Sequence, residues 1–442
     1  MLKLISSFSE EFLKLSPEKE IRIISNSETE GITSTAILIR TFKRLDRKFS
    51  SKIIKKQDNE ALDKELKLNK EKIIFLINLK ISNLEILNKI NKTIFIIDNN
   101  QLKIKNVNEK IKIISPYLTK NPEENSCAVS SICYIFSKQI SEENSDLSKI
   151  ALIGIVNNKN ISRIDKKIMN DTIELTIKRG LVLYPATRPL KRVLEYSISP
   201  YIPGVTGNGP GALELLKEAK ISENKNLTEL NEEEMSRLVA GILSRGINKE
   251  KVNLGEIYTL EFFNVKEDLK EISVLINACT KLGHDDTAIA YCLENEKAKT
   301  KAIDIFTKYR QDLVSGIKTA EEMEEISGKG FVILNAKDRI KDAIVGTVCS
   351  ILSSAPKYDE GTILIGMAYN KDKIKVFARM VGKKGRDIRE VLEKTMSSYK
   401  TSKNEILVGG HSLEAGCLLE KDEEEKFIEA LKKNLEVEIV KI

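Results

Sequence analysis

Short side chains that carry oxygen follow apolar runs at four places in the first 160 residues. The first is the segment Ser25-Asn26-Ser27-Glu28-Thr29-Glu30-Gly31. Its Glu-x-Glu-Gly spacing suits a sharp turn that points two carboxylates the same way, because glycine lets the backbone turn. The other places are Asn78, Asp98-Asn99-Asn100 and Asn158. Two interpretations fit this pattern: a paired-carboxylate site, or residues that only cap the helices that follow.

Five apolar runs rich in β-branched residues must position these side chains. They are IRIIS (21–25), SKIIKK (51–56), KIIFLIN (72–78), KTIFIID (92–98) and IKIIS (111–115), and residues 32–45 have helical periodicity. Nearly apolar strands separated by helical patterns predict a parallel sheet that is covered on both faces. Ligands bind beyond the carboxyl ends of the strands in such sheets, so the polar residues lie where chemistry is expected.

The rest of the chain predicts a connector and a second α/β domain. Residues 185–211 hold five of the nine prolines and four glycines, which argues against any regular element there. A mostly helical stretch follows, and from about residue 328 strands and helices alternate again, ending in a helix and a strand at the C-terminus. We therefore expect an α/β protein with an N-terminal parallel-sheet domain at 1–195, a Pro/Gly-rich crossing and helical connector at 196–325, and a smaller C-terminal α/β domain at 326–442.

Composition limits the classes of function. The 442 residues carry 72 Lys and Arg against 65 Asp and Glu, and a net charge of +7 among so many mixed charges does not by itself indicate nucleic-acid binding. His284 and His411 are the only histidines, which excludes a multi-His metal centre. The six cysteines form no CxxC pair and are interpreted as buried thiols of a reducing compartment. Without a signal peptide or an apolar run of about 18 residues, we expect a soluble cytoplasmic protein with no membrane contact.

The order of the polar sites resembles the DHH phosphoesterase superfamily, in particular RecJ-like nucleases of the archaeal, GINS-associated type. The family motif Ser-His-x-Asp-x-Asp-Gly-x-x-Ser is matched by residues 25–34, a strand-end Asp by Asn78, and Asp-His-His by residues 98–100. Asn158 matches the Asp of a Gly-x-x-x-Asp turn. Two later segments, 277–281 and 409–416, resemble the family's Asn-Ala-x-x-Arg element and its Gly-Gly-His-x-x-Ala-Ala-Gly signature. The resemblance covers nearly the whole chain and implies a DHH-type domain followed by a DHH-associated domain.

The same resemblance argues against the family's activity. Relatives hold two divalent ions, manganese or magnesium, and use them for in-line phosphoryl displacement. The matched metal ligands here are Glu28, Glu30, Asn78 and Asp98, and asparagine replaces further catalytic residues at Asn26, Asn99, Asn100 and Asn158. Three carboxylates cannot balance two divalent cations, so we expect an inactive protein without a cofactor. The alternative is a slow manganese- or magnesium-dependent single-stranded 5′–3′ exonuclease or small-oligonucleotide phosphodiesterase.

The second domain keeps features that could hold a single strand. A Gly-Gly pair lets backbone N–H groups approach a phosphate, and basic residues lie nearby in the sequence. The candidate nucleic-acid-binding residues are Lys281, Arg379, Lys383, Lys384, Arg386, Gly409, Gly410 and His411. The alternative is a tight turn beside a solvated helix face, and Glu414, where the family has a small residue, weakens the match.

The expected function is therefore a RecJ-like scaffold of DNA replication or repair that binds single-stranded DNA or RNA. The resemblance implies the GINS complex and the MCM helicase as protein partners. A second basic segment, residues 40–56, interleaves Phe42 and Phe49 with eight Lys or Arg residues. This combination can follow a nucleic-acid backbone and stack bases, and the alternative places both phenylalanines in the core.

Overall fold

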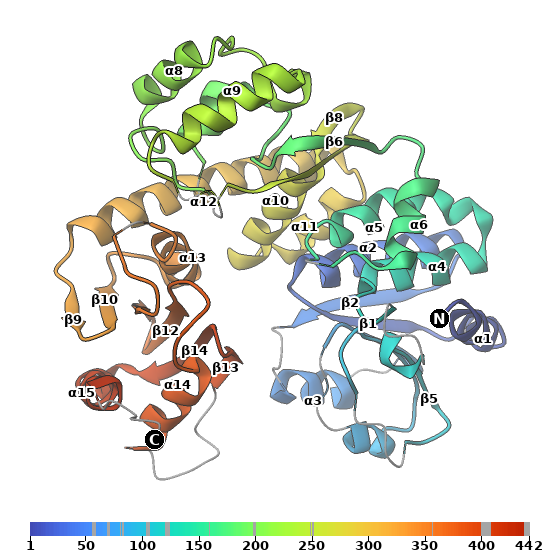
Figure 1. Ribbon diagram of the computed structural model, residues 1–442. Helices are drawn as coiled ribbons and strands as arrows, with labels where there is room; N and C mark the ends of the chain where they lie inside the picture. Colours follow the sequence, from blue (N-terminus) through green and yellow to red (C-terminus); the bar gives the residue numbers. More distant parts are fainter. Residues whose placement is uncertain are drawn as a thin grey trace. The chain divides into compact units, whose positions relative to one another are not determined.

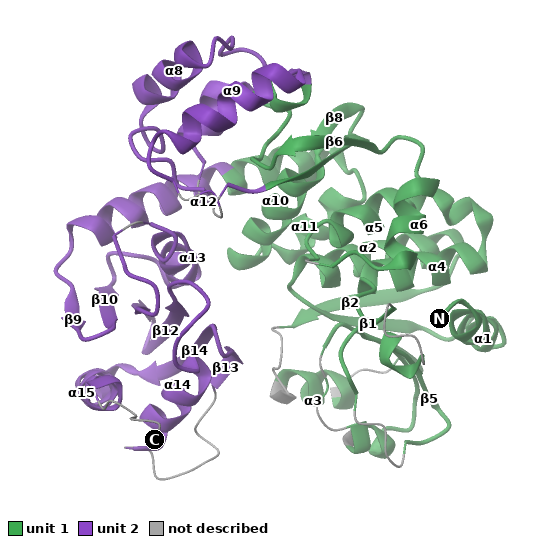
Figure 2. Cartoon of the chain, in the orientation of Figure 1, with its two compact units in different colours: residues 1–188, 226–228, 254–306 green, residues 189–225, 229–253, 307–442 purple. Residues whose placement is uncertain are grey.

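The structure is a computed structural model, and it describes residues 1–54, 59–68, 71–79, 81, 84–102, 107–119, 124–158, 160–197, 200–247, 249, 252–355, 357–398 and 408–436 (Figure 1). These residues form two compact units (Figure 2). Unit 1 contains residues 1–188, 226–228 and 254–306, and unit 2 contains residues 189–225, 229–253 and 307–442. The units interleave along the chain, and the three-part division at 195 and 325 stays a prediction.

A five-stranded parallel sheet forms the centre of unit 1. The strands are β1 (Ile21–Asn26), β2 (Phe49–Ile54), β3 (Ile73–Ile77), β4 (Thr93–Ile97) and β5 (Ile111–Ile114). All five lie at the apolar runs from which they were predicted. Their order is β2-β1-β3-β4-β5, so β2 and β3 flank β1 on opposite sides. The crevice between β1 and β3 is therefore the topological switch point, where open α/β sheets bind ligands.

Helices and a small antiparallel sheet complete unit 1. The helices are α1 (Leu2–Leu13), α2 (Thr29–Arg44), α3 (Asn59–Leu68), α4 (Val129–Ile140), α5 (Ser148–Ile155), α6 (Arg163–Asp171), α10 (Leu269–Lys281) and α11 (Asp285–Cys292), with 3-10 turns η1 (Leu84–Lys89), η2 (Pro116–Leu118) and η4 (Glu142–Leu147). The small sheet has the order β6-β7-β8, with β6 (Thr176–Leu181), β7 (Leu254–Phe262) and β8 (Val265–Asp268).

Both faces of the parallel sheet are buried, as its continuous apolar strands predict. On one face the ring of Phe75 stacks on that of Phe95, with 4.9 Å between their centroids. Phe42 of α2 and Phe12 of α1 pack against Phe75 at 5.1 and 5.6 Å. The other face packs on α3 and η1 through a separate aliphatic cluster that includes Leu62. A sheet covered in this way leaves only its strand ends for polar chemistry.

Unit 2 is built on a six-stranded mixed sheet with the order β13-β14-β12-β11-β10-β9. The strands are β9 (Ile326–Gly328), β10 (Phe331–Lys337), β11 (Ile363–Asn370), β12 (Lys373–Met380), β13 (Val408–His411) and β14 (Glu414–Glu420). The helices are α7 (Leu190–Glu195), α8 (Gly209–Glu218), α9 (Glu232–Leu243), α13 (Asp342–Leu352), α14 (Ile388–Ser397) and α15 (Glu424–Glu436), with the 3-10 turn η8 (Lys421–Glu423). Helix α12 (Glu296–Glu322) and the 3-10 turn η5 (Leu227–Glu229) each contain residues of both units. A strand expected at the C-terminus lies outside the described residues.

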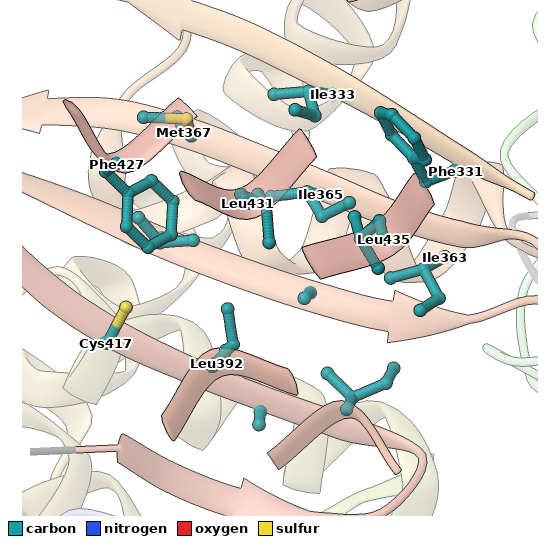
Figure 3. Packing of buried hydrophobic residues seen from close by; sticks show 14 of the residues in the cluster. Phe331, Ile333, Ile363, Ile365, Met367, Leu392, Cys417, Phe427, Leu431 and Leu435 are labelled. Atoms are coloured by element: carbon teal, nitrogen blue, oxygen red, sulfur yellow. The ribbon is translucent and has the colours of Figure 1, made fainter. Parts of the chain in front are cut away.

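The two faces of this sheet are covered differently. Helices α14 and α15 cover one face, where Leu392, Phe427 and Leu431 pack on strand residues such as Ile365 (Figure 3). Helix α13 packs on the opposite face, against β11 and β12. Phe377 of β12 lies so close to this helix that a Cβ atom on Gly346 would come within 3.0 Å of its ring.

The Pro/Gly-rich stretch 185–211 contains regular structure, so the expectation that it holds none is wrong. Helix α7 begins directly after Pro189, and α8 carries Pro210 in its first turn. Proline suits the first turn because the N–H groups there have no partner within the helix. Within the described residues, no helix is both long and apolar enough to cross a membrane. All six cysteines are buried thiols, as predicted.

Candidate functional site

Two buried asparagines close the switch point between β1 and β3. Asn26 ends β1, and Asn78 directly follows β3. Nδ2 of Asn26 donates to the backbone O of Asn78 at 2.5 Å, and Oδ1 of Asn26 accepts from the N–H of Glu28 at 3.1 Å. Asn78 has a φ of 53°, which asparagine adopts more readily than most residues. The Asn26 amide thus binds backbone groups on both sides of the crevice.

The turn from β1 into α2 requires a glycine at position 31. A Cβ atom on Gly31 would lie 2.2 Å from Oδ1 of Asn26 and 2.7 Å from Oγ of Ser25. Glu28 is the exposed N-cap residue of α2, and Glu30 lies in its first turn. The start of a helix stabilises negative charge, so both carboxylates sit where the helix dipole favours them.

Glu30 is the carboxylate that links the separate segments. Its Oε2 accepts from Nδ2 of Asn99 at 3.3 Å and from the N–H of Val129 at 3.5 Å. Burial raises the pKa of Glu30 to about 7, although hydrogen bonds from Asn158 and Val129 oppose this rise. Its Oε1 is buried without a hydrogen-bond partner among the described residues. Glu30 therefore loses part of its negative charge near neutral pH.

Asp98 accepts hydrogen bonds from Asn100, two residues further along the chain. It is buried at the carboxyl end of β4. Its Oδ1 accepts from the backbone N–H of Asn100 at 2.9 Å and from Nδ2 of the same residue at 2.5 Å. The backbone O of Asn100 accepts in turn from Oγ of Ser115, at 3.1 Å, after β5. This Asx turn uses Asp98 as a local acceptor.

The asparagines of the site act as hydrogen-bond donors. Nδ2 of Asn26 donates to the backbone O of Asn78, Nδ2 of Asn99 to Glu30, and Nδ2 of Asn100 to Asp98. In a centre with two divalent ions, cations would bind the carboxylate oxygens that receive N–H groups here. Within the part of the chain that is described, no group of three or more His, Cys, Asp or Glu side chains is arranged to hold a metal ion. The donor set does not fit a two-ion centre.

Asp165 is a buried residue beside the site that the sequence analysis missed. Its carboxylate accepts from Oγ of Ser131 at 2.5 Å, from the N–H of Ala128 at 3.2 Å, and from Oγ and N–H of Ser162 at 2.7 and 3.0 Å. Ala128 is the N-cap residue of α4, so Asp165 fixes the start of the helix whose first N–H binds Glu30. The capping-box pattern Ser162-x-x-Asp165 marks a helix start, but it does not reveal these distant donors.

Helix α10 contributes a second group that was missed. Nζ of Lys270 donates to Oδ1 of Asn157 at 3.1 Å, and Oγ of Ser273 contacts Asn157 and Thr29. Burial lowers the pKa of Lys270. Asn157 precedes Asn158, so α10 braces the end of α5 against the start of α2. No sequence spacing connects these segments.

The Glu30 carboxyl makes the stability of the protein depend on pH. A carboxyl whose pKa is higher in the folded protein than in the unfolded chain binds its proton more tightly when folded, so stability falls as pH rises from about 4.5 through 7. We expect Glu30→Gln to match the parent at about pH 5 and to be more stable by about 1–2 kcal/mol at about pH 8. Thermal unfolding at both pH values measures this difference.

An internal comparison isolates the contribution of Glu30. Burial also raises the pKa of Glu271 to about 7. Glu271 is present in the parent and in Glu30→Gln, so its contribution cancels from the difference in stability between them. An equal stability difference at both pH values would show that the substitution acts through packing rather than through charge.

A second candidate site lies in unit 2, where the basic loop 381–387 meets the hairpin of β13 and β14. We call residues 409–413, which hold Gly409, Gly410 and the turn after them, the glycine turn. The N–H of Met380 donates to the backbone O of Leu413 at 2.9 Å, and the N–H of Ile388 donates to that of Ser412 at 2.9 Å. These bonds fix both ends of the loop 381–387 against the turn between β13 and β14. The exposed residues that gather there are Lys383, Lys384, Gly409, Gly410 and His411. Gly410 has a φ of 126°, and a Cβ atom on it would lie 2.3 Å from the backbone O of Glu414.

Two of the predicted binding residues, Arg379 and Arg386, bind other parts of unit 2, and a third, Lys281, lies in unit 1. Arg379 pairs with Glu414, with 2.5 Å between Nη1 and Oε2. Nη1 of Arg386 donates to the backbone O of Leu435 at 2.6 Å, near the end of α15, where a cation stabilises the helix. Lys281 lies exposed at the end of α10 in unit 1. The predicted element 277–281 is thus part of a helix.

Three arginines of the basic segment 40–56 bind other segments of unit 1. Arg40 donates to the backbone O of Leu293 at 2.8 Å, Arg44 pairs with Asp146 at 2.7 Å, and Arg47 donates to the backbone O of Ser16 at 3.0 Å. Phe42 is fully buried, so the core interpretation holds for it. Phe49 is half-buried, and Lys55 and Lys56 lie outside the described residues.

Comparison with known families identifies the chain. A family model described as archaeal Cdc45 matches residues 47–338, which is more than half of the sequence. The chain belongs to the archaeal Cdc45 family. An uncharacterized protein of Methanocaldococcus jannaschii is 24% identical over 420 residues, which cover 92% of this chain and 91% of that protein.

Solved structures share the fold of this archaeal Cdc45 family member. Cdc45 from Entamoeba histolytica matches with a TM-score of 0.66 and 10% identity, over 98% of this chain and 97% of that chain. RecJ of Thermus thermophilus in complex with Mn²⁺ matches with a TM-score of 0.60 and 13% identity, over 99% of this chain but 55% of that chain. A manganese-bound exonuclease RecJ matches with a TM-score of 0.60 and 12% identity, over 99% of this chain and 95% of that chain. The chain thus spans about half the length of the Thermus RecJ.

These matches confirm the resemblance to DHH and RecJ-like proteins and the predicted α/β fold class. At identities this low, the structural likeness shows the fold and nothing more. The archaeal Cdc45 family member is therefore a RecJ-like protein in architecture.

Proposed function

We propose that this archaeal Cdc45 family member is a RecJ-like protein without nuclease activity, which serves DNA replication as a scaffold that binds single-stranded nucleic acid through unit 2. The observation that carries the proposal is the bonding of Glu30 and Asp98 to asparagine N–H groups at the switch point. An amide N–H occupies a carboxylate oxygen without bringing the positive charge that lowers the pKa of a bound water. The site then keeps its shape and lacks the means to generate a hydroxide.

The binding part of the proposal rests on the second site. Exposed Lys383 and Lys384 lie in a loop that is bonded at both ends to the glycine turn. Lysines of this kind neutralise phosphates, and glycines let a backbone approach closely. The relation to archaeal Cdc45 supports partners in the replication machinery, and we propose the GINS complex and the MCM helicase as those partners.

A digestion assay tests the absence of activity. We expect the full chain with manganese or magnesium to leave a 5′-labelled single strand intact over hours, because Glu30 and Asp98 already accept hydrogen bonds from asparagine amides. The rival function is a slow manganese-dependent exonuclease that uses Glu28, Glu30 and Asp98, the carboxylates that remain. Digestion that disappears in Glu30→Ala and Asp98→Ala variants would establish this rival function and refute the proposal.

A binding titration tests the second part. Labelled single-stranded DNA and RNA of about 20 nucleotides are titrated with the full chain at about 50 and about 200 mM salt. We expect binding that weakens as salt increases, since released counterions drive contact with phosphates. A lack of binding to both nucleic acids at the lower salt concentration would contradict the proposal.

A further inference from the structure

The face of the unit 2 sheet that carries α13 also carries a row of charged side chains. Arg379 of β12 is paired with Glu414 of β14, and Glu414 is paired with His411 of β13. Partners directly opposite each other in antiparallel strands project on the same face, so the three side chains form one row across the sheet. Cys417 and Leu419 of β14 alternate with this row and lie in the core on the other face.

The neighbouring row of the sheet contains two glycines. Phe377 is paired with Gly416, and Gly416 is paired with Gly409. Neither glycine has a side chain to cover the strands, and Gly409 is exposed. The charged row of Arg379, Glu414 and His411 therefore borders backbone that two glycines leave without side chains, and this backbone is exposed at Gly409.

Glu414 lies between the two basic groups of its row. Its Oε2 is 2.5 Å from Nη1 of Arg379, and its Oε1 is 3.7 Å from Nε2 of His411. Nδ1 of His411 accepts from the N–H of Leu413 at 3.3 Å, so the ring hydrogen is on Nε2 and faces Glu414. The carboxylate thus occupies the position between these groups that an anionic ligand would take.

A phosphate would use the same donors. A guanidinium and an imidazole N–H bind phosphate oxygens with the geometry with which they bind a carboxylate. The exposed fractions of the Arg379 and Glu414 side chains are 38% and 37%, so water screens the pair and a ligand can displace it. Displacement has a cost, because Glu414 remains nearby as a negative charge.

We infer that Glu414 is an internal competitor for phosphate, which weakens nucleic-acid binding at the glycine turn by occupying Arg379 and His411. The inference rests on the proposed binding function of unit 2 and deepens it. It assigns Arg379 and His411 to a phosphodiester subsite of single-stranded nucleic acid that is closed while Glu414 occupies it. Gln at this position keeps the shape of the side chain and removes its charge.

The test compares matched substitutions on one strand. Affinity for labelled oligothymidine of about 20 nucleotides is measured at about 50 mM salt with the full chain, Glu414→Gln and Glu420→Gln. Glu420 also lies on β14 and pairs with a basic residue of β12, Lys373, at 3.3 Å, so its substitution makes the same charge change. We expect Glu414→Gln to bind about fivefold tighter and Glu420→Gln to bind like the parent. Thermal unfolding checks that both variants are folded.

A second substitution tests whether the gain in affinity of Glu414→Gln depends on Arg379. Arg379→Gln is expected to change the affinity little when Glu414 is present and to abolish the gain in the Glu414→Gln background, because only there is the guanidinium available. Equal losses in both backgrounds would contradict the inference.

The possible results separate this inference from the proposed function. Binding by Glu414→Gln alone would support the inference and refute binding by the parent protein. Binding by the parent that Glu414→Gln leaves unchanged would overturn the inference and leave the proposed function standing. Equal tightening by Glu420→Gln would overturn the inference in favour of a general charge effect, and no binding by any variant would refute both.

Discussion

Replacing Asp165 by alanine is expected to lower the free energy of unfolding by roughly 3–5 kcal/mol. The carboxylate is fully buried and accepts hydrogen bonds from two hydroxyls and two backbone N–H groups. Alanine removes the acceptor and leaves these donors without a partner in a place that water does not reach. Each buried donor that loses its partner costs about 1–3 kcal/mol, and relaxation recovers part of the sum.

The substitution also acts on the switch-point site. Asp165 holds the N-cap residue Ala128, and the next N–H along the chain, that of Val129, binds Glu30. Unfolding in urea, followed by circular dichroism, measures the loss of stability. Asp171→Ala is the matched control, because it removes the same group from an exposed position on the same helix. If Asp165→Ala destabilised the protein no more than Asp171→Ala, the hydrogen-bond network would not be the support that we describe.

Much of the fold could be predicted because its strands are short, continuous apolar runs. The run at 72–78, for example, becomes β3 (Ile73–Ile77), with every residue buried. The stretch 185–211 was misjudged because its prolines were taken to exclude helices, whereas Pro189 and Pro210 stand at helix starts. Proline interrupts a helix interior but suits its first turn, so its position within an element matters more than its number.

The positions of Asn26, Asn78 and Asp98 at strand ends could also be predicted from the sequence, since parallel strands deliver their carboxyl ends to one edge. Their contacts could not. The bond from Asn26 to Asn78 joins residues far apart in the sequence, and only the packed sheet determines it. The same holds for the charge of Glu30, because its raised pKa comes from burial, which no local spacing encodes.

Glu414 shows how strand register turns a sequence anomaly into a contact. The residue type alone indicates only that an acidic side chain stands where the DHH family has a small one. The antiparallel register places it opposite Arg379 and on the same face. A shift of one residue would have pointed the carboxylate into the apolar core instead.

Reversing two charges in the loop 381–387 is expected to weaken single-strand binding about a hundredfold at about 50 mM salt. The change is Lys383→Glu with Lys384→Glu. Both lysines are exposed in a loop whose ends are bonded to Ser412 and Leu413, the turn that follows Gly409 and Gly410 of β13. Each substitution removes a phosphate contact and adds a repelling charge, so the dependence of affinity on salt should also become less steep by more than about one unit.

The control makes the same charge change on helix α15, outside the loop. Lys426 and Lys433 are exposed on α15, which covers the face away from the charged row of Arg379 and Glu414. Lys426→Glu with Lys433→Glu therefore alters the net charge equally and leaves the loop intact. If both double variants lost affinity to the same extent, binding would follow net charge and not the glycine turn. A selective loss in the loop variant would instead locate the phosphate contacts beside Gly409 and Gly410, where the backbone is bare enough for a strand to approach.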